Sequence, residues 1–224
     1  MLETAGTVTN PAMTNPVTRA QVEMTWGLVL LWVALGGSTM YLLRDRVRAS
    51  LVKVRLGPRM EFFLFATGLV LVEEAITTGM TNLAPELGVK IGQAYITASA
   101  NYLHVILFHS AVVIVPMFAA WAWLLGRYSF DPKAVTLLYG VTGALAESLS
   151  FGLQNIVGAG LWIWVYGLMV YLPAYCVAPI PAARMPGLRA VILALVLPIV
   201  CGAIAAIFVL IVFHPPVVEF NSGG

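Results

Sequence analysis

The chain has 224 residues, of which 60% are hydrophobic and only 10% are charged, whereas about 25% of the residues of a typical soluble domain are charged. A soluble protein of this size leaves much of its surface in water and could not bury so much apolar side chain. The composition therefore excludes a soluble globular domain, a disordered chain and a nucleic-acid-binding protein, and it predicts a polytopic membrane protein. The net charge of +2 is too small to indicate an acidic partner.

Six stretches are apolar over the length of about 20 residues that a membrane-spanning helix needs. They cover about residues 24–43, 60–80, 98–125, 135–157, 159–179 and 190–213. We therefore expect an all-α polytopic membrane protein with about six transmembrane helices in a single domain over residues 24–213. Residues 1–23 contain Pro, Thr and Asn and no apolar run, so they predict an extended N-terminal tail, and residues 214–224 form a C-terminal tail.

Lysine and arginine gather in three predicted loops that fall on one side of a six-helix arrangement: 44–59, 127–133 and 181–189. In membrane proteins, an excess of these residues marks the cytoplasmic loops. The sequence therefore predicts a multi-pass protein of the plasma membrane, with the basic loops in the cytoplasm and both termini outside. Membrane lipids are then its main partner, and contact between the basic loops and anionic headgroups is a secondary expectation.

Five ionisable side chains lie within the predicted spans: Glu73, Glu74, His104, His109 and Glu147. Such residues cost about 2.5 kcal/mol or more in hydrocarbon, so they are retained where they face protein or water. At 1.5 Å per residue, the predicted helix ends place all five within about 10 Å of one level in the outer half of the bilayer. Three neighbouring helices with ionisable groups at one depth indicate one shared polar site.

Glu73 and Glu74 are adjacent in the middle of a predicted helix. Two like charges side by side in a low dielectric cannot both ionise cheaply, so one is expected to be protonated or bound to a cation. This favours a functional role for the pair over a purely structural one. His109 lies about 140° around its helix from His104, at 100° per residue, so only one of the two histidines is expected to point directly at the glutamates.

The helices over 135–157 and 159–179 are predicted to form an antiparallel hairpin, because only the short Gly-containing connection 157–160 separates them. Gly140 and Gly143 share a helix face with Glu147, and glycines at such positions let another helix approach closely.

The segment Glu73-Glu74-Ala75-Ile76-Thr77-Thr78-Gly79 resembles the EExxxRG motif of the CAAX-prenyl-protease and bacteriocin-processing family of multi-helix intramembrane proteases. The second motif of that family, FxxxH, lies on the next helix, and His109 occurs at the corresponding spacing. The third motif, HxxxN, corresponds to residues 151–155, where Asn155 matches. The resemblance covers about residues 60–156.

Three motif positions differ from the family pattern. Thr78, Val105 and Phe151 stand where the family has arginine, phenylalanine and histidine. The missing histidine puts catalytic competence in question more than membership of the family.

The resemblance implies hydrolysis of a peptide bond in a membrane peptide or protein. Glu73 would act as a general base on a water molecule held with His109, and Glu74 would help to position the site. Asn155 would donate a hydrogen bond to the oxyanion, an interaction that is strongest where water is excluded. The implied catalytic residues are therefore Glu73, Glu74, His109 and Asn155.

Glutamate and histidine side chains would also suit a divalent metal such as Zn²⁺ or Fe²⁺. The candidate ligands are Glu73, His104, His109 and Glu147. Glu147 precedes the third motif by one turn, so it could replace the missing histidine as a ligand or proton relay. The sequence contains no compact HExxH motif, which makes the metal prediction weaker than the catalytic one.

Two other functions stay open. Chains of intramembrane Glu and His residues are also typical of proton or cation relays, and Pro116, Pro173 and Pro198 could break helices as transporters require. Alternatively, the motif positions that differ favour a non-catalytic accessory subunit of a membrane complex, or a family member that binds peptides or lipids without cutting them.

Overall fold

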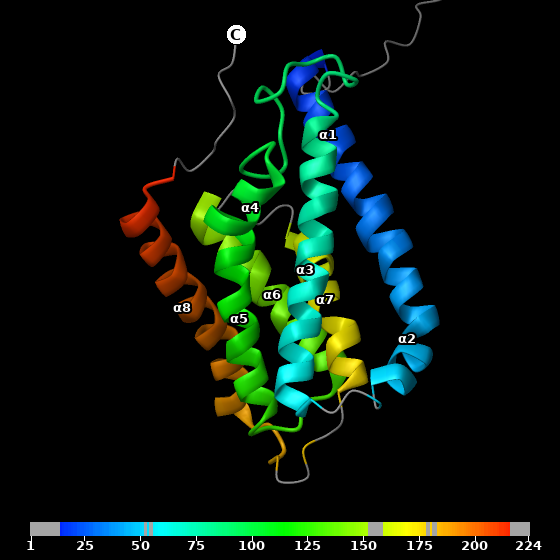
Figure 1. Ribbon diagram of the computed structural model, residues 1–224, viewed down its shortest axis with the longest axis vertical. Coiled ribbons are helices and arrows are strands. Elements are labelled where there is room, and N and C mark those ends of the chain that lie inside the picture. The colour runs from blue at the N-terminus through cyan, green and yellow to red at the C-terminus, as the bar shows by residue number, and fades with distance from the viewer. Residues whose placement is uncertain are drawn as a thin grey trace, which may run out of the picture.

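The computed structural model is a bundle of long helices (Figure 1). It describes residues 14–51, 53, 56–151, 159–177, 180 and 183–215, with the backbone alone at 150 and 151. The elements in chain order are α1 (Pro16–Leu28), the π-helix η2 (Val29–Gly36), α2 (Gly37–Leu51), α3 (Pro58–Asn82), α4 (Tyr102–Phe108), α5 (Ser110–Leu125), α6 (Pro132–Phe151), α7 (Ala159–Cys176) and α8 (Leu188–Phe213). The all-α prediction is confirmed for these ranges, where every regular element is helical.

Four helices in the described part of the chain are long and apolar enough to cross a membrane: Pro16–Leu51, α3, α7 and α8. The bent pair of α4 and α5 raises the number to five if it forms one span. Helix α6 covers most of the predicted span 135–157 but is not in this set, and residues 152–158 lie outside the described residues. These helices support a membrane-embedded bundle with four or five apolar spans.

The first helix is longer than the predicted span. Elements α1, η2 and α2 run on from one another over Pro16–Leu51. The Asn15 side chain accepts a hydrogen bond from the Val17 amide at 2.9 Å, and a proline follows Asn15 at the first helical position. Both features favour a helix start, so the prediction of an extended tail is wrong for residues 16–23.

The third predicted span, 98–125, is not one helix. It begins only at Tyr102, and α4 and α5 meet at an angle of 45°. His109 lies at the break, with φ −126° and ψ −101°, which is outside the helical region of backbone conformations. The break places His109 between two helices, where a continuous helix had been predicted.

Helices α6 and α7 pack closely through glycine, as the hairpin prediction required. A methyl group added at Gly140 would collide with the backbone carbonyl of Ile163, and one at Gly143 would collide with the Tyr166 side chain. Without a Cβ at these positions the two backbones can approach to a distance that any other residue would prevent. The expectation that these glycines admit a neighbouring helix is confirmed, and α7 is that helix.

The three basic loops gather at one end of the bundle, the lower end in Figure 1. Arg59 Nη2 donates to the Gly126 carbonyl at 3.3 Å, which joins the start of α3 to the loop after α5. The Arg184 amide donates to the Arg127 carbonyl at 2.9 Å, which joins that loop to the segment before α8. These contacts bring together loops that the sequence had placed on one side of the membrane.

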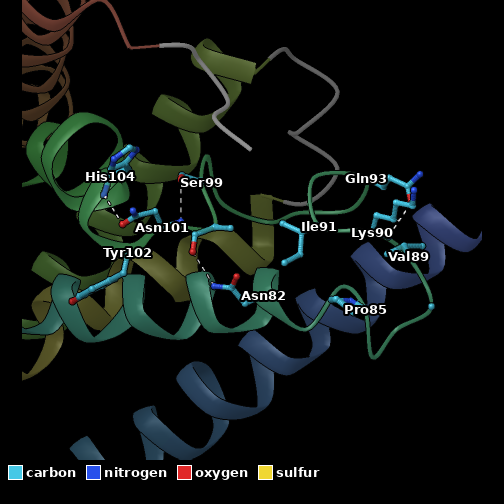
Figure 2. A pocket seen from close by; sticks show the side chains of 12 residues that line it. Asn82, Pro85, Val89, Lys90, Ile91, Gln93, Ser99, Asn101, Tyr102 and His104 are labelled. Atoms are coloured by element: carbon cyan, nitrogen blue, oxygen red, sulfur yellow. Dashed lines mark hydrogen bonds between the residues drawn. The ribbon is translucent and has the colours of Figure 1, made fainter. Parts of the chain in front are cut away.

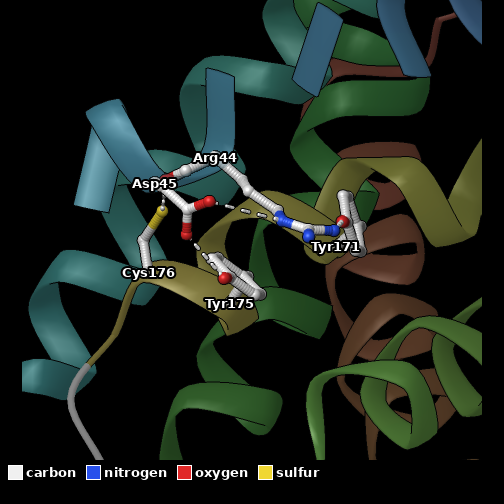
Figure 3. Close-up of polar contacts among 5 residues, drawn as sticks. All are labelled: Arg44, Asp45, Tyr171, Tyr175 and Cys176. Atoms are coloured by element: carbon white, nitrogen blue, oxygen red, sulfur yellow. Dashed lines mark hydrogen bonds and ion pairs between the residues drawn. The ribbon is translucent and has the colours of Figure 1, made fainter. Parts of the chain in front are cut away.

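Polar side chains connect α2 to α7 near the same end (Figure 3). Arg44 Nη1 donates to the Tyr171 hydroxyl at 3.4 Å, and the Tyr175 hydroxyl donates to Asp45 Oδ1 at 2.7 Å. Cys176 Sγ donates to the Arg44 carbonyl at 3.8 Å. The end of the long first helix is therefore fixed against the bundle by polar contacts.

The loop 83–101 covers the opposite end of the bundle and packs against the start of α1. Its small apolar cluster consists of Ala20, Met24, Ala84, Val89 and Ala94. The loop is also joined to α3, because the Ile96 amide donates to Thr81 Oγ1 at 3.2 Å. This loop forms a lid over the polar face of α3.

We expect Trp32→Phe to lower the free energy of unfolding by about 1 kcal/mol, the typical net contribution of one hydrogen bond. Trp32 is 1% exposed, and its Nε1 donates to the Val165 carbonyl on α7 at 3.0 Å. Trp164→Phe is the matched control, because Trp164 is 59% exposed. Unfolding by denaturant in detergent measures both, and equal stability of the two variants would contradict a role for the Trp32 contact.

Candidate functional site

A cavity of about 630 Å³ lies among α3, α5, α6, α7 and α8, beneath the loop 83–101. Most of its lining is apolar. The polar side chains that line it from the helices and the α4–α5 break are Glu73, Glu74, Thr77, His109, Ser110, Glu147 and Tyr166. Of the five ionisable side chains predicted to share one polar site, four line this cavity, and His104 does not.

Helix α3 supplies the two adjacent glutamates. Glu73 is 4% exposed and Glu74 is 3% exposed, although their neighbour Val72 is exposed on the opposite side of the helix. The buried threonines Thr77 and Thr81 follow at helical spacing on the same face as the glutamates. This spacing gives α3 one polar face toward the bundle and one apolar face away from it.

The two carboxylates differ in their surroundings. Thr77 Oγ1 donates to Glu74 Oε2 at 3.3 Å, and Ser110 at the start of α5 also hydrogen-bonds to the Glu74 side chain. The Glu73 carboxylate is buried beside the carboxylates of Glu74 and Glu147. Glu74 is therefore held in place by neighbouring hydroxyl groups, and Glu73 lines the cavity beside two other carboxylates.

The third carboxylate, Glu147 of α6, is paired with α7. The Tyr166 hydroxyl donates a hydrogen bond to Glu147 Oε1. Both side chains line the cavity, and the ring of Tyr166 lies against Gly143. The close packing of α6 on α7 therefore sets the position of this hydrogen bond.

The two histidines lie in different places. His109, at the break between α4 and α5, lines the cavity together with the glutamates. His104 lines a second pocket of about 1240 Å³, formed by α4, the end of α3 and the loop 83–101 (Figure 2). There it contacts Phe108 edge to face, with ring centroids 5.7 Å apart. The structure thus separates His104 from the predicted site and keeps His109 in it.

The described residues do not fit the predicted metal centre. Nowhere among them do three or more His, Cys, Asp or Glu side chains come together in a group that could hold a metal ion. The predicted ligand set of Glu73, His104, His109 and Glu147 is split between two pockets. The structure therefore gives a Zn²⁺ or Fe²⁺ site no support.

One predicted residue of the site lies outside the described part of the chain, and two residues of the site were not predicted. Asn155, the predicted oxyanion donor, lies outside the described residues. Sequence analysis missed Ser110 and Tyr166. Tyr166 could have been found from the predicted hairpin. It lies 19 residues after Glu147, on the helix that returns, and a short turn between the two helices would place both residues at the same depth in the membrane. Ser110 directly follows His109, but its place in the site depends on the helix break.

The arrangement is suited to proton transfer. Three carboxyl groups, one imidazole and three hydroxyl-bearing aliphatic side chains line a mostly apolar cavity, and no Lys or Arg is among the described residues that line it. A carboxylate in such surroundings can act as a general base.

Comparison with known proteins finds that no family model, no curated protein and no solved structure matches this chain.

Proposed function

We propose that the protein is a glutamate-dependent intramembrane hydrolase that cleaves a membrane peptide or protein. One observation carries the proposal: Glu73, Glu74 and His109, which match positions of the CAAX-prenyl-protease and bacteriocin-processing motifs, line one cavity together with Glu147. The resemblance and the cavity are independent of each other, because the motif spacing in the sequence does not require the three side chains to meet.

In this proposal Glu73 removes a proton from a water molecule shared with His109. The oxygen of that water attacks the peptide carbonyl and forms a new C–O bond. Glu73 then returns the proton to the leaving amine as the C–N bond breaks. Glu74, held by Thr77, positions the base, and Asn155 stabilises the oxyanion.

We further propose the full six-span arrangement, with α6 as the additional span. The basic end then faces the cytoplasm, following the positive-inside rule, in the plasma membrane. Residues 95–98 of the loop at the opposite end contribute to the lining of the cavity. The cavity therefore lies in the outer half of the bilayer in this orientation.

The proposal is tested with the full chain in lipid nanodiscs and a set of single-span peptides in ¹⁸O-labelled water. Hydrolysis incorporates one ¹⁸O atom into the new carboxylate of each cleaved peptide, which mass spectrometry detects. Glu86→Gln should cleave at the wild-type rate, because Glu86 is exposed on the loop 83–101 and does not line the cavity. Absence of labelled product from every peptide would rule out the hydrolase.

Proton or cation translocation is a second candidate, favoured by the three carboxyl groups that line the cavity with no Lys or Arg among its described lining residues. Buried carboxylates of this kind are common in ion pathways. Flux measured in liposomes, lost in Glu73→Gln, together with no cleavage of any peptide, would replace the hydrolase by this alternative.

A further inference from the structure

We propose that the cavity binds an amphiphilic organic cation, meaning a primary or substituted ammonium group attached to an apolar body. This inference rests on the proposed function in one respect, because it names the class of substrate or ligand that the same site recognises. It does not require the hydrolytic step.

The charge of the cavity is the first argument. Glu73, Glu74 and Glu147 line it, and no lysine or arginine is among its lining residues in the part of the chain that the structure describes. The two ion pairs found in the described structure, Arg19–Glu23 and Arg44–Asp45, involve none of these carboxylates. Buried carboxylates without a cationic partner are strongly disfavoured, so a cation that enters the cavity gains attraction that the protein itself does not supply.

The position of Glu73 provides the second argument. Its side chain is 4% exposed and lines the cavity, and the carboxylates of Glu74 and Glu147 lie close to it. Glu74 accepts from Thr77, and Glu147 accepts from Tyr166. A buried carboxylate beside two others is stabilised by a compensating positive charge, and an ammonium group supplies that charge together with hydrogen-bond donors.

The aromatic side chains of the cavity give the third argument. Trp162, Tyr166 and Phe108 line it, and the Trp162 and Tyr166 rings lie with centroids 6.3 Å apart at an angle of 45°. Aromatic faces attract ammonium groups, most strongly where water is excluded. Acidic and aromatic groups in one cavity are the combination that recognises organic cations.

Size and lining favour an organic cation over a metal ion. The cavity volume of about 630 Å³ lies within the usual range of about 300–1,000 Å³ for small-molecule sites. Val113, Ile114, Met117, Val209 and Leu210 form apolar walls. A bare ion would leave these walls uncovered, and no metal-binding group of three side chains occurs in the described residues. An apolar body attached to the ammonium group would fill this space.

The test measures equilibrium binding of radiolabelled 4-phenylbutylamine to the full chain in neutral-lipid nanodiscs, with 4-phenylbutanol as the uncharged counterpart. We expect saturable binding of the amine and not of the alcohol. Glu73→Gln should weaken amine binding about tenfold or more, because it leaves the buried ammonium without its counter-charge. Glu86→Gln should bind like the wild type, because it is exposed outside the cavity. Equal binding of amine and alcohol, or unchanged binding in Glu73→Gln, would overturn the proposal.

A folding defect in Glu73→Gln is detected by its thermal unfolding in the same nanodiscs. If that variant unfolds at a lower temperature than the wild type, Glu147→Gln is used in its place, since Glu147 lines the same cavity from another helix. Unchanged amine binding in a folded Glu147→Gln variant would then overturn the proposal, and weakened binding would support it.

A lysine side chain of a membrane peptide and a free amine present the same chemistry, and peptide binding distinguishes these sources. A single-span peptide with lysine in its outer half is compared with the same peptide carrying norleucine. Preference for the lysine peptide identifies a peptide side chain as the ligand, whereas binding of the free amine alone identifies a small molecule.

Amine binding without any peptide cleavage would overturn the proposed hydrolase and support the proposed cation site. Peptide cleavage without a preference for lysine and without amine binding would support the hydrolase and overturn the cation site.

Discussion

Glu73→Gln is expected to lower the rate of peptide cleavage by about 10²- to 10⁴-fold, the range typical of removing a general base. Glutamine has nearly the same shape as glutamate, so it fills the same space, but its amide cannot accept the proton of the attacking water. Glu73 lines the cavity with His109, and it is the first glutamate of the segment that resembles the EExxxRG motif. It is therefore the one best placed to act on a water molecule.

Glu74→Gln is expected to cause a smaller loss, because Glu74 Oε2 already accepts a hydrogen bond from Thr77. Measuring kcat and KM separately distinguishes the roles. The loss in Glu73→Gln should appear in kcat, since a general base acts in the transition state, whereas Glu74→Gln should change both parameters moderately.

Glu61→Gln is the matched control on the same helix. Glu61 lies in the first turn of α3, several turns before the cavity, and is not among its lining residues. This variant should retain wild-type kcat and KM. A larger loss of kcat in Glu74→Gln than in Glu73→Gln would assign the general base to Glu74 instead. Wild-type activity in all three variants would show that neither glutamate takes part in the mechanism.

The helix positions were predicted best where hydrophobic runs alone determine them. The predicted spans 60–80 and 190–213 correspond to α3 and α8, each of which extends about two residues further at one or both ends. Long apolar runs predict helices in a membrane because every backbone group must be hydrogen-bonded within the segment.

The errors have a common physical cause. Hydropathy marks where the chain meets lipid, but it does not mark where a helix ends in water. The start of α1 depends on the Asn15 cap and the following proline, so the predicted tail 1–23 included residues that are helical. The break at His109 lies inside an apolar stretch, and an apolar stretch has the same composition whether or not the helix bends.

The candidate site was predictable in part, because the depth of a residue in the membrane follows from the position of its apolar run. Depth arguments selected Glu73, Glu74 and Glu147 correctly as residues of one region, and these line a single cavity. They could not separate His104 from His109, since the change of direction at the break decides which pocket each one lines. Tyr166 was missed because a tyrosine among aromatic residues of an apolar helix is ordinarily an interfacial anchor.

Gly140→Ala is expected to lower the free energy of unfolding by about 1–3 kcal/mol, the usual cost of overpacking a buried contact. The added methyl group would collide with the backbone carbonyl of Ile163 and would lie 3.0 Å from the Ile163 Cγ2 atom. A backbone carbonyl cannot rotate away as a flexible side chain can, so α6 and α7 would have to separate. Gly68→Ala on α3 is the matched control, because nothing lies within 4 Å of the added methyl group there.

Separation of these helices should also affect the site, because the Tyr166 hydrogen bond to Glu147 crosses the same interface. We therefore expect Gly140→Ala to weaken both cleavage and amine binding at temperatures where the protein is still folded, whereas Gly68→Ala should leave both unchanged. Denaturant unfolding in detergent gives the stability, and the nanodisc assays give the activity and binding. Loss of stability with full activity would show that the α6–α7 contact supports the fold alone. Equal stability of the two alanine variants would show that the bundle accommodates the methyl group by a shift of α7.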